Sequence, residues 1–164
     1  MITEPLDITR HLPTHESKEY PERNVGDIEL VVIHHEGDPN PETESTPFDI
    51  ARWHVEGLDR AGICYHSVVT RDGIQWKTNL DRTVSKHVGE TYNPKAIGIC
   101  ATGNFDQEPP TQDQALGLLI EVLRYLNAYP DAKVVGHKEL GDTSCPGEFL
   151  EMDKFCGAID LLGR

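Results

Sequence analysis

Two imidazoles and one thiol in this sequence have the chemical types and the spacing to bind a single metal ion. His137 and Cys145 lie eight residues apart, the first after a β-branched run and the second in a loop that contains Gly and Pro. His34 lies far upstream, directly after the apolar run Val31–Ile33. Zinc prefers nitrogen and sulfur ligands, and a catalytic zinc site keeps a fourth position open for water. Because no fourth soft ligand is suitably placed in the sequence, we predict one catalytic Zn²⁺ ion bound by His34, His137 and Cys145.

The chemistry that such a site favours is hydrolysis. One Zn²⁺ ion and one thiolate leave a formal charge of about +1 on the site. This charge can lower the pKa of bound water to about 7, which supplies hydroxide at neutral pH. The ion can also polarise a carbonyl oxygen while negative charge develops on it. Cleavage of an amide bond follows from these two effects.

Histidine and cysteine also occur together in blue-copper sites, in zinc deaminases and in nucleophilic Cys–His pairs. A blue-copper site needs a nearby methionine, and neither Met1 nor Met152 lies in a cysteine-containing ligand loop. A zinc deaminase has His-x-Glu followed by Pro-Cys-x-x-Cys. His137 matches the first part of that motif, but Cys145 precedes Pro-Gly and has no partner cysteine. A Cys–His nucleophilic pair stays open, as does a structural role for a histidine that only accepts a hydrogen bond.

The elements that must position these side chains follow from hydrophobic periodicity. Apolar or alternating runs bounded by turn residues predict strands over residues 28–35, 64–70, 74–77, 96–101 and 133–136. Apolar residues at spacings of three and four predict helices over residues 47–58, 112–128 and 152–162. We therefore expect an α/β (α+β) fold in one domain, with a central mixed sheet of about five to six strands flanked by helices.

The first 27 residues differ from the rest of the chain. They are polar, contain three prolines and lack periodicity. We expect residues 1–27 to form an extended arm packed on a domain of residues 28–164. Within that domain, adjacent residues of a strand point to opposite faces, so His34 and His35 cannot both reach one metal ion without a bulge.

The composition excludes several classes of function. The 164 residues carry a formal net charge of −13, which argues against nucleic-acid binding because that is driven by Lys and Arg on phosphates. No apolar run approaches the roughly 18 residues that a membrane helix requires, so we expect no membrane insertion.

The cysteines form no CxxC motif, and Cys64, Cys100 and Cys156 lie in apolar patterns as core residues. The N-terminus shows no secretory signal, so we expect synthesis in the cytoplasm. The sequence does not indicate an oligomeric state.

Seven short stretches of the chain form an ordered series. They are Val-Ile-His-His (32–35), Tyr-His-Ser-Val-Val-Thr-Arg-Asp-Gly (65–73), Lys-His-Val-Gly (86–89), Asn93, Ile-Gly-Ile-Cys-Ala-Thr-Gly-Asn-Phe (97–105), Gly-His-Lys-Glu (136–139) and Thr-Ser-Cys-Pro-Gly (143–147). Together they cover roughly residues 28–150. This series resembles the zinc-dependent N-acetylmuramoyl-L-alanine amidases of the phage-lysozyme and peptidoglycan-recognition-protein type. The resemblance implies hydrolysis of the amide bond between N-acetylmuramic acid and L-alanine in peptidoglycan.

The resemblance also implies roles for individual residues. It makes His34 the first zinc ligand and leaves His35 on the opposite face as a structural residue. The family's catalytic tyrosine falls on Tyr65, whose phenol would orient the attacking water. Two residues before the cysteine ligand, Thr143 follows the pattern common in catalytic recognition proteins, where the phage-lysozyme type has Lys. Its hydroxyl can donate a hydrogen bond to the developing oxyanion without adding a charge.

Two loop residues match positions that line the substrate groove of the resembling family. They are His87 and Asn93, and we predict that both hydrogen-bond a muramyl peptide of the peptidoglycan substrate. The remaining imidazole and indole side chains of interest are expected to pack or support the site rather than contact sugar: His54, His66, Trp53 and Trp76.

Cys145 favours an enzyme, because the non-catalytic recognition proteins of the resembling family lose this ligand. A peptidoglycan-binding module without turnover is the first alternative. The second is a cytosolic amidase that acts on soluble muropeptides, although that group usually has Asp as its last ligand. The small size, the lack of a secretory signal and the lack of a separate wall-binding module suggest a phage or prophage endolysin. Such a protein would be released by a partner pore and act at the bacterial cell wall.

Overall fold

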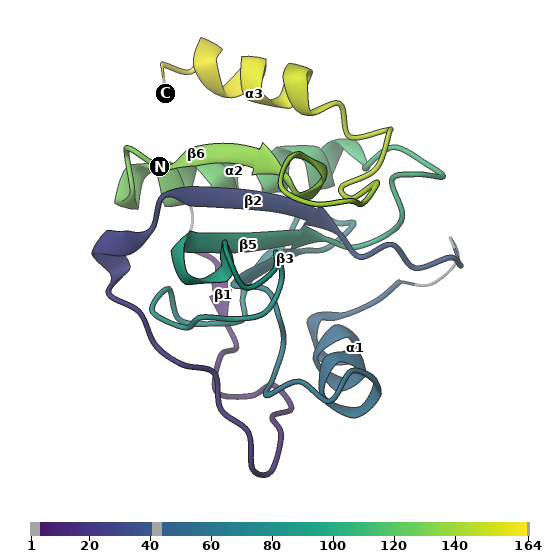
Figure 1. Cartoon of the computed structure of the whole chain (residues 1–164). Helices are drawn as coiled ribbons and strands as arrows, with labels where there is room; N and C mark the ends of the chain where they lie inside the picture. The colour runs from purple at the N-terminus through teal and green to yellow at the C-terminus, as the bar shows by residue number, and fades with distance from the viewer. Residues whose placement is uncertain (1–3, 41–43, 164) are drawn as a thin grey trace.

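The computed structural model describes residues 4–40 and 44–163, which form one mixed sheet with helices packed on it (Figure 1). The strands are β1 (Leu6–Asp7), β2 (Leu30–His35), β3 (Ser67–Val69), β4 (Gln75–Lys77), β5 (Ala96–Ala101) and β6 (Lys133–Gly136). The α-helices of the described residues are α1 (Pro47–Arg52), α2 (Gln112–Ala128) and α3 (Met152–Leu161). The six strands lie in the order β1-β4-β3-β5-β2-β6. The predicted fold class, a mixed sheet flanked by helices, is confirmed.

The register of the central strands brings two candidate ligands together. β2 lies between β5 and β6 and is parallel to both. Ile33 of β2 pairs with Gly136 of β6, so the residues that follow them, His34 and His137, emerge side by side. In open sheets of parallel strands, binding sites form at this carboxyl edge.

The two faces of β2 have different neighbours. Val31 and Ile33 belong to the main core, together with residues of α2 and α3. Figure 1 shows α2 behind the sheet and α3 above β6. Val32 points the other way and packs with Val88, from the loop of residues 81–92. His34 shares the face of Val32 because side chains alternate along a strand, so this aperiodic loop becomes its neighbour.

Most of the predicted elements agree with the structure to within two residues at each end, but β3 and α1 are clearly shorter than predicted. β3 covers only residues 67–69 of the predicted 64–70. The reason is that the Tyr65 carbonyl accepts hydrogen bonds from the side chains of Thr78 and Asn79, at 2.8 and 2.7 Å, which replace pairing in the sheet. α1 ends at Arg52, and the chain continues as a π-helical turn over Trp53–Gly57. None of the helices in residues 4–40 and 44–163 is both long and apolar enough to span a bilayer.

The segment before β2 contributes a short strand to the sheet, which its aperiodic sequence did not predict. β1 completes the edge of the sheet, where Leu6 pairs with Trp76 of β4. Further along, the buried side of the segment is tied to the loop of residues 81–95 by the Arg23 guanidinium. Arg23 donates hydrogen bonds of 2.8 to 3.0 Å to the backbone carbonyls of Asp81, Asn93 and Ala96. The N-terminal segment therefore helps to hold the loop that lies beneath His34.

Candidate metal centre

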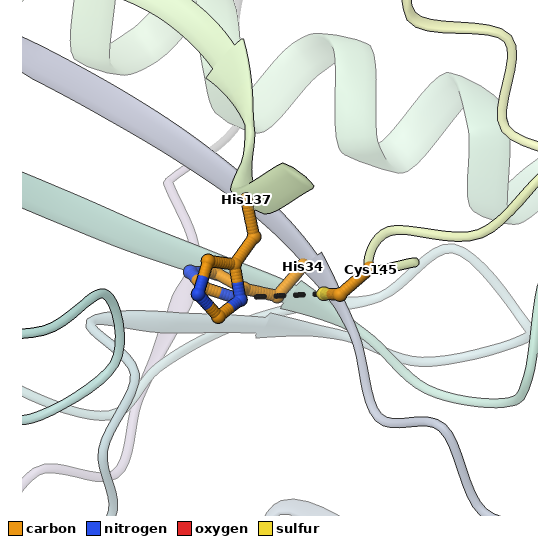
Figure 2. A group of neighbouring side chains, drawn as sticks. All are labelled: His34, His137 and Cys145. Carbon is orange, nitrogen blue, oxygen red and sulfur yellow. Dashed lines mark hydrogen bonds between the residues drawn. The ribbon is translucent and has the colours of Figure 1, made fainter. Parts of the chain in front are cut away.

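His34, His137 and Cys145 converge at the carboxyl ends of β2 and β6, and their side chains point toward one another (Figure 2). One ligand atom from each side chain lies within 4.8 Å of those of the other two. The Sγ atom of Cys145 lies 3.6 Å from Nδ1 of His34. Zinc bonds of about 2.3 Å to sulfur and about 2.1 Å to nitrogen, at a tetrahedral angle, give a sulfur–nitrogen separation of roughly 3.6 Å. The spacing of this pair therefore fits two ligands of one zinc ion.

A short turn and a loop set His137 relative to Cys145. The turn begins at His137 and is closed where the N–H of Gly136 donates to the Glu139 carboxylate at 2.6 Å. The N–H of Lys138 then donates to the Cys145 carbonyl at 2.7 Å. This backbone bond joins the two segments, so the end of β6 positions both candidate ligands.

The far side of the Cys145 loop is held against the segment that follows β5. Gly147 has a φ of +100°, and a Cβ atom there would lie only 2.4 Å from the carbonyl carbon of Phe105. Only glycine allows this conformation and this approach. Nearby, the Ser144 hydroxyl donates to the Asp106 carboxylate at 2.6 Å. Cys145 is thus carried by a loop with fixed contacts on both sides.

Burial dominates the electrostatics of the three side chains. It holds the pKa of His34 well below 6.5, with the neighbouring His87 and His137 adding to the effect. It also lowers the pKa of His137 and raises that of Cys145 to about 11. Neutral imidazoles are the form that binds a metal, and a divalent cation supplies the positive charge that favours a thiolate in a buried site. Two neutral imidazoles and one thiol are a donor set that fits Zn²⁺.

A family model described as N-acetylmuramoyl-L-alanine amidase matches residues 24–148, a span that contains all three converging side chains. The chain belongs to this family. Its structure is similar to the Ph2119 endolysin from the Thermus scotoductus MAT2119 bacteriophage, with a TM-score of 0.79 and 28% identity over 94% of this chain and 97% of that one. The N-acetylmuramoyl-L-alanine amidase LysC from Clostridium intestinale URNW shares the fold, with a TM-score of 0.79 and 23% identity over 96% and 98% of the two chains.

Curated relatives of this amidase-family chain include recognition proteins. Peptidoglycan recognition protein 1 from Bos indicus is 28% identical over 107 residues, which are 62% of this chain and 55% of that protein. Peptidoglycan-recognition protein LB from Drosophila melanogaster is 28% identical over 130 residues, 74% of this chain and 56% of that protein. The chain thus spans a little over half the length of these two relatives.

Tyr65 and Thr143 lie close to the three converging side chains of the amidase domain. The Tyr65 ring is centred 5.2 Å from the ring of His34. Burial, followed by the neighbouring Cys100 and Cys145, raises the pKa of Tyr65 well above 10, so its phenol keeps a proton to donate. The Oγ1 atom of Thr143 accepts the N–H of Cys145 at 3.1 Å, which leaves its own hydroxyl proton to donate to another group.

His87 and Asn93, predicted to contact substrate, lie inside the protein with only 9% and 5% of their surface exposed. The Nδ1 atom of His87 lies 2.9 Å from Nε2 of His34, and its Nε2 atom lies 3.4 Å from the Ala96 carbonyl oxygen. The Oδ1 atom of Asn93 accepts the N–H groups of His87 and Val88 at 3.0 and 2.9 Å. The structure therefore places this pair behind His34, and both ring nitrogens of His87 already have protein partners. A contact with substrate stays a prediction.

Three other buried histidines serve the scaffold. Each accepts a backbone N–H at Nδ1, at 3.0 Å in every case: His35 from Phe105, His54 from Cys64 and His66 from Gly98. His35 points away from His34, as strand alternation predicts, and fixes the segment against which the Cys145 loop packs.

A cleft of about 580 Å³ extends from Tyr65 between the segment after β2 and the helical region that follows it. Trp53, expected to pack rather than to contact sugar, is 61% exposed and lines this cleft. A Cβ atom on Gly57 would lie 2.4 Å from the indole, so the ring rests on that glycine. The lining also includes three carboxylates that the sequence pattern did not single out: Glu36, Asp38 and Asp49. The sequence held one signal for this placement: Trp53 precedes Gly57 by four residues in a helical segment, and a glycine there leaves room for the indole.

Proposed function

We propose that this chain is a zinc-dependent hydrolase that cleaves the amide bond between N-acetylmuramic acid and L-alanine in peptidoglycan. The observation that carries the proposal is the convergence of His34, His137 and Cys145. The ring of Tyr65, which is centred 5.2 Å from that of His34, lines a neighbouring cleft. Membership of the amidase family supports the choice of bond. The sulfur–nitrogen spacing and the donor chemistry of the three residues support zinc.

The three side chains have defined roles in this proposal. His34 would hold the ion through Nδ1 and Cys145 through Sγ, with a ring nitrogen of His137 as the third ligand. When bound, zinc supplies a Lewis acid that polarises the scissile carbonyl and lowers the pKa of water to about 7. The protein supplies the fixed positions of the donors, because β2 and β6 end at the same place in the sheet.

Two hydroxyl groups complete the proposed catalytic residues. The Tyr65 phenol, which keeps its proton, orients the attacking water through a hydrogen bond. The Thr143 hydroxyl donates to the oxygen on which negative charge develops. Its proton is not used in the bond with Cys145, in which the Thr143 oxygen accepts the N–H. Removal of one such donor typically lowers kcat by about 10²-fold to 10³-fold. Thr143→Val is therefore expected to slow hydrolysis without removing zinc.

The cleft beside Tyr65 is the proposed binding site of the muramyl peptide. Its volume of about 580 Å³ lies within the range of about 300–1,000 Å³ that is usual for small-molecule sites. Action at the bacterial cell wall as a phage or prophage endolysin is part of the same proposal. The structural similarity to the Ph2119 endolysin supports it.

Release of stem peptide from defined substrates tests the proposal. Zinc-loaded protein is incubated with purified muramyl peptides and, separately, with intact sacculi. We expect peptide with a new L-alanine N-terminus in both reactions, detected by mass spectrometry, and one zinc per chain by elemental analysis. A chelator is expected to stop release, and zinc to restore it. Full activity of the metal-free protein would reject the mechanism.

A peptidoglycan-binding module without turnover is the second candidate, favoured by the similarity to recognition proteins. It predicts that the zinc-loaded protein retains a labelled muropeptide and releases no free peptide. A third candidate is an amidase specialised for soluble muropeptides. It would cleave the purified muramyl peptides and leave intact sacculi uncleaved, so the two substrates distinguish it from a wall-lytic amidase.

A further inference from the structure

The imidazole of His34 has two ring nitrogens with different partners. Nδ1 lies 3.6 Å from the Cys145 sulfur, whereas Nε2 lies 2.9 Å from Nδ1 of His87. We propose that His87 is a positioning residue, which fixes the tautomer of His34 so that Nδ1 is the unprotonated nitrogen available to zinc. This inference rests on the proposed zinc function and adds a residue outside the ligand set.

The proton assignment follows from an atom that can only accept. The Ala96 carbonyl oxygen lies 3.4 Å from Nε2 of His87, so this nitrogen carries the hydrogen and donates it. A neutral His87 then has a bare Nδ1, which accepts the Nε2–H of His34. A neutral His34 with its hydrogen on Nε2 keeps its lone pair on Nδ1, on the side of Cys145. One directed series of hydrogen bonds therefore sets the ligand atom.

The protein holds His87 in place from three directions. Asn93 Oδ1 accepts the N–H of His87 and that of the next residue. Arg23 donates to the carbonyls of Asn93 and Ala96 at 3.0 and 2.8 Å, and the latter is the acceptor for His87. Gly98 of β5 leaves room for the ring, because a Cβ atom there would lie 2.6 Å from its Nδ1. A side chain fixed this way can orient its neighbour.

The expected effect is on metal affinity as well as on rate. Hydrogen-bond partners of metal-binding histidines fix the tautomer and the ring orientation, and their removal typically costs about 10-fold to 100-fold in metal affinity or activity. Because His87 is not a proposed ligand, its loss should weaken zinc binding without removing any donor atom.

Three substitutions at one position separate the hydrogen bond from packing. His87→Asn keeps an acceptor at the δ position, His87→Gln moves the amide to the ε position, and His87→Leu removes both. We expect zinc dissociation constants, measured by competition with a coloured chelator, to rise about 10-fold to 100-fold for Leu and Gln and to stay close to wild type for Asn. Urea unfolding of each zinc-free variant checks that the fold is retained.

A second measurement uses the wild-type protein and needs no variant to fold. Long-range ¹H–¹⁵N correlation spectra of the zinc-free protein report which nitrogen of His34 carries hydrogen. We expect the Nε2–H tautomer for His34 and for His87. An Nδ1–H tautomer of His34 overturns the inference, as does equal zinc affinity of the folded Leu variant and the wild type.

The outcomes distinguish this inference from the proposed function. A wild-type protein that binds no zinc, or that binds zinc and releases no peptide, contradicts the proposed function. The tautomer of His34 in the zinc-free protein is read independently of either result. A zinc-loaded, active wild type with an unaffected Leu variant contradicts only the role of His87.

Discussion

Two buried polar clusters lie on opposite faces of the sheet and treat charge in opposite ways. On the face of α2, Glu121 is 1% exposed and accepts hydrogen bonds from the Ser67 hydroxyl and from the Arg124 guanidinium, the latter at 2.9 and 2.6 Å. On the other face lie two imidazoles and a thiol. Within residues 4–40 and 44–163, no ion pair involves His34, His137 or Cys145.

The difference separates a self-contained structural cluster from the proposed metal site. The carboxylate of Glu121 already has its counter-charge, so this cluster can be complete without any ligand. At the other cluster, lone pairs of nitrogen and sulfur converge, and burial keeps the imidazoles neutral. A buried group of donors with no internal cation is the arrangement that a metal ion completes.

Loss of a ligand should give the largest effect. In Cys145→Ala we expect no zinc-dependent stabilisation and no detectable amide hydrolysis. In the wild type, zinc at 1,000 times its dissociation constant should add about 4 kcal/mol to the free energy of unfolding. Urea unfolding with and without zinc measures the difference. Cys156→Ser, at a half-buried thiol outside the site, is the matched control. Equal stabilisation of Cys145→Ala and the wild type by zinc would contradict the proposal that Cys145 is a zinc ligand.

Breaking the opposite cluster should lower stability and leave zinc binding alone. Glu121→Gln removes the charge that faces Arg124 and is expected to cost about 3 kcal/mol of unfolding free energy, since one buried partner loses its counter-charge. Urea unfolding of zinc-free protein measures this cost, and chelator competition measures zinc affinity. A weakened zinc affinity in this variant would mean that the two faces are not independent.

A pH series should show a third type of buried polar group, the neutral scaffold histidine. Burial lowers the pKa of His54 from 6.5 to about 4. Above pH 6.5 the folded and unfolded states both hold this ring neutral, so its contribution is fully present. Between about pH 6.5 and 4 only the unfolded state gains the proton, and stability falls by up to about 1.4 kcal/mol per pH unit from this residue.

His54→Asn sharpens that measurement, because the amide oxygen can still accept the Cys64 N–H that His54 accepts. Stability from urea unfolding should decline less steeply with falling pH in this variant than in the wild type. Identical slopes would show that His54 has the same pKa in the folded and unfolded states.

The exposed indole of Trp53 should give the smallest change in stability. Because 61% of its surface is exposed, we expect Trp53→Ala to alter the free energy of unfolding by about 0.5 kcal/mol or less. We expect KM for muropeptides to rise while kcat is kept. Leu161→Ala, at an exposed apolar residue outside the cleft, is the control for steady-state kinetics. The same KM for both variants would show that Trp53 does not contribute to substrate binding.

Periodic segments were predicted more accurately than aperiodic ones. The apolar run before His34 and the three-and-four spacing of α2 produced elements at the expected positions. β3 was predicted too long because Thr78 and Asn79 compete for the Tyr65 carbonyl, and their positions depend on the hairpin. The loop that carries His87 has no periodicity, so its predicted place in a groove had no local physical basis.

The sequence by itself determined which donors are present, and it placed His34 and His35 on opposite faces of a strand. Both results are local, since they depend on side-chain chemistry and on backbone alternation. Only the tertiary structure decided that His34, His137 and Cys145 meet, that His87 lies behind His34 and that Trp53 faces a cleft. These placements depend on contacts between distant segments, such as the bond from Arg23 to the Asn93 carbonyl 70 residues away. No periodic pattern in the chain encodes such a contact.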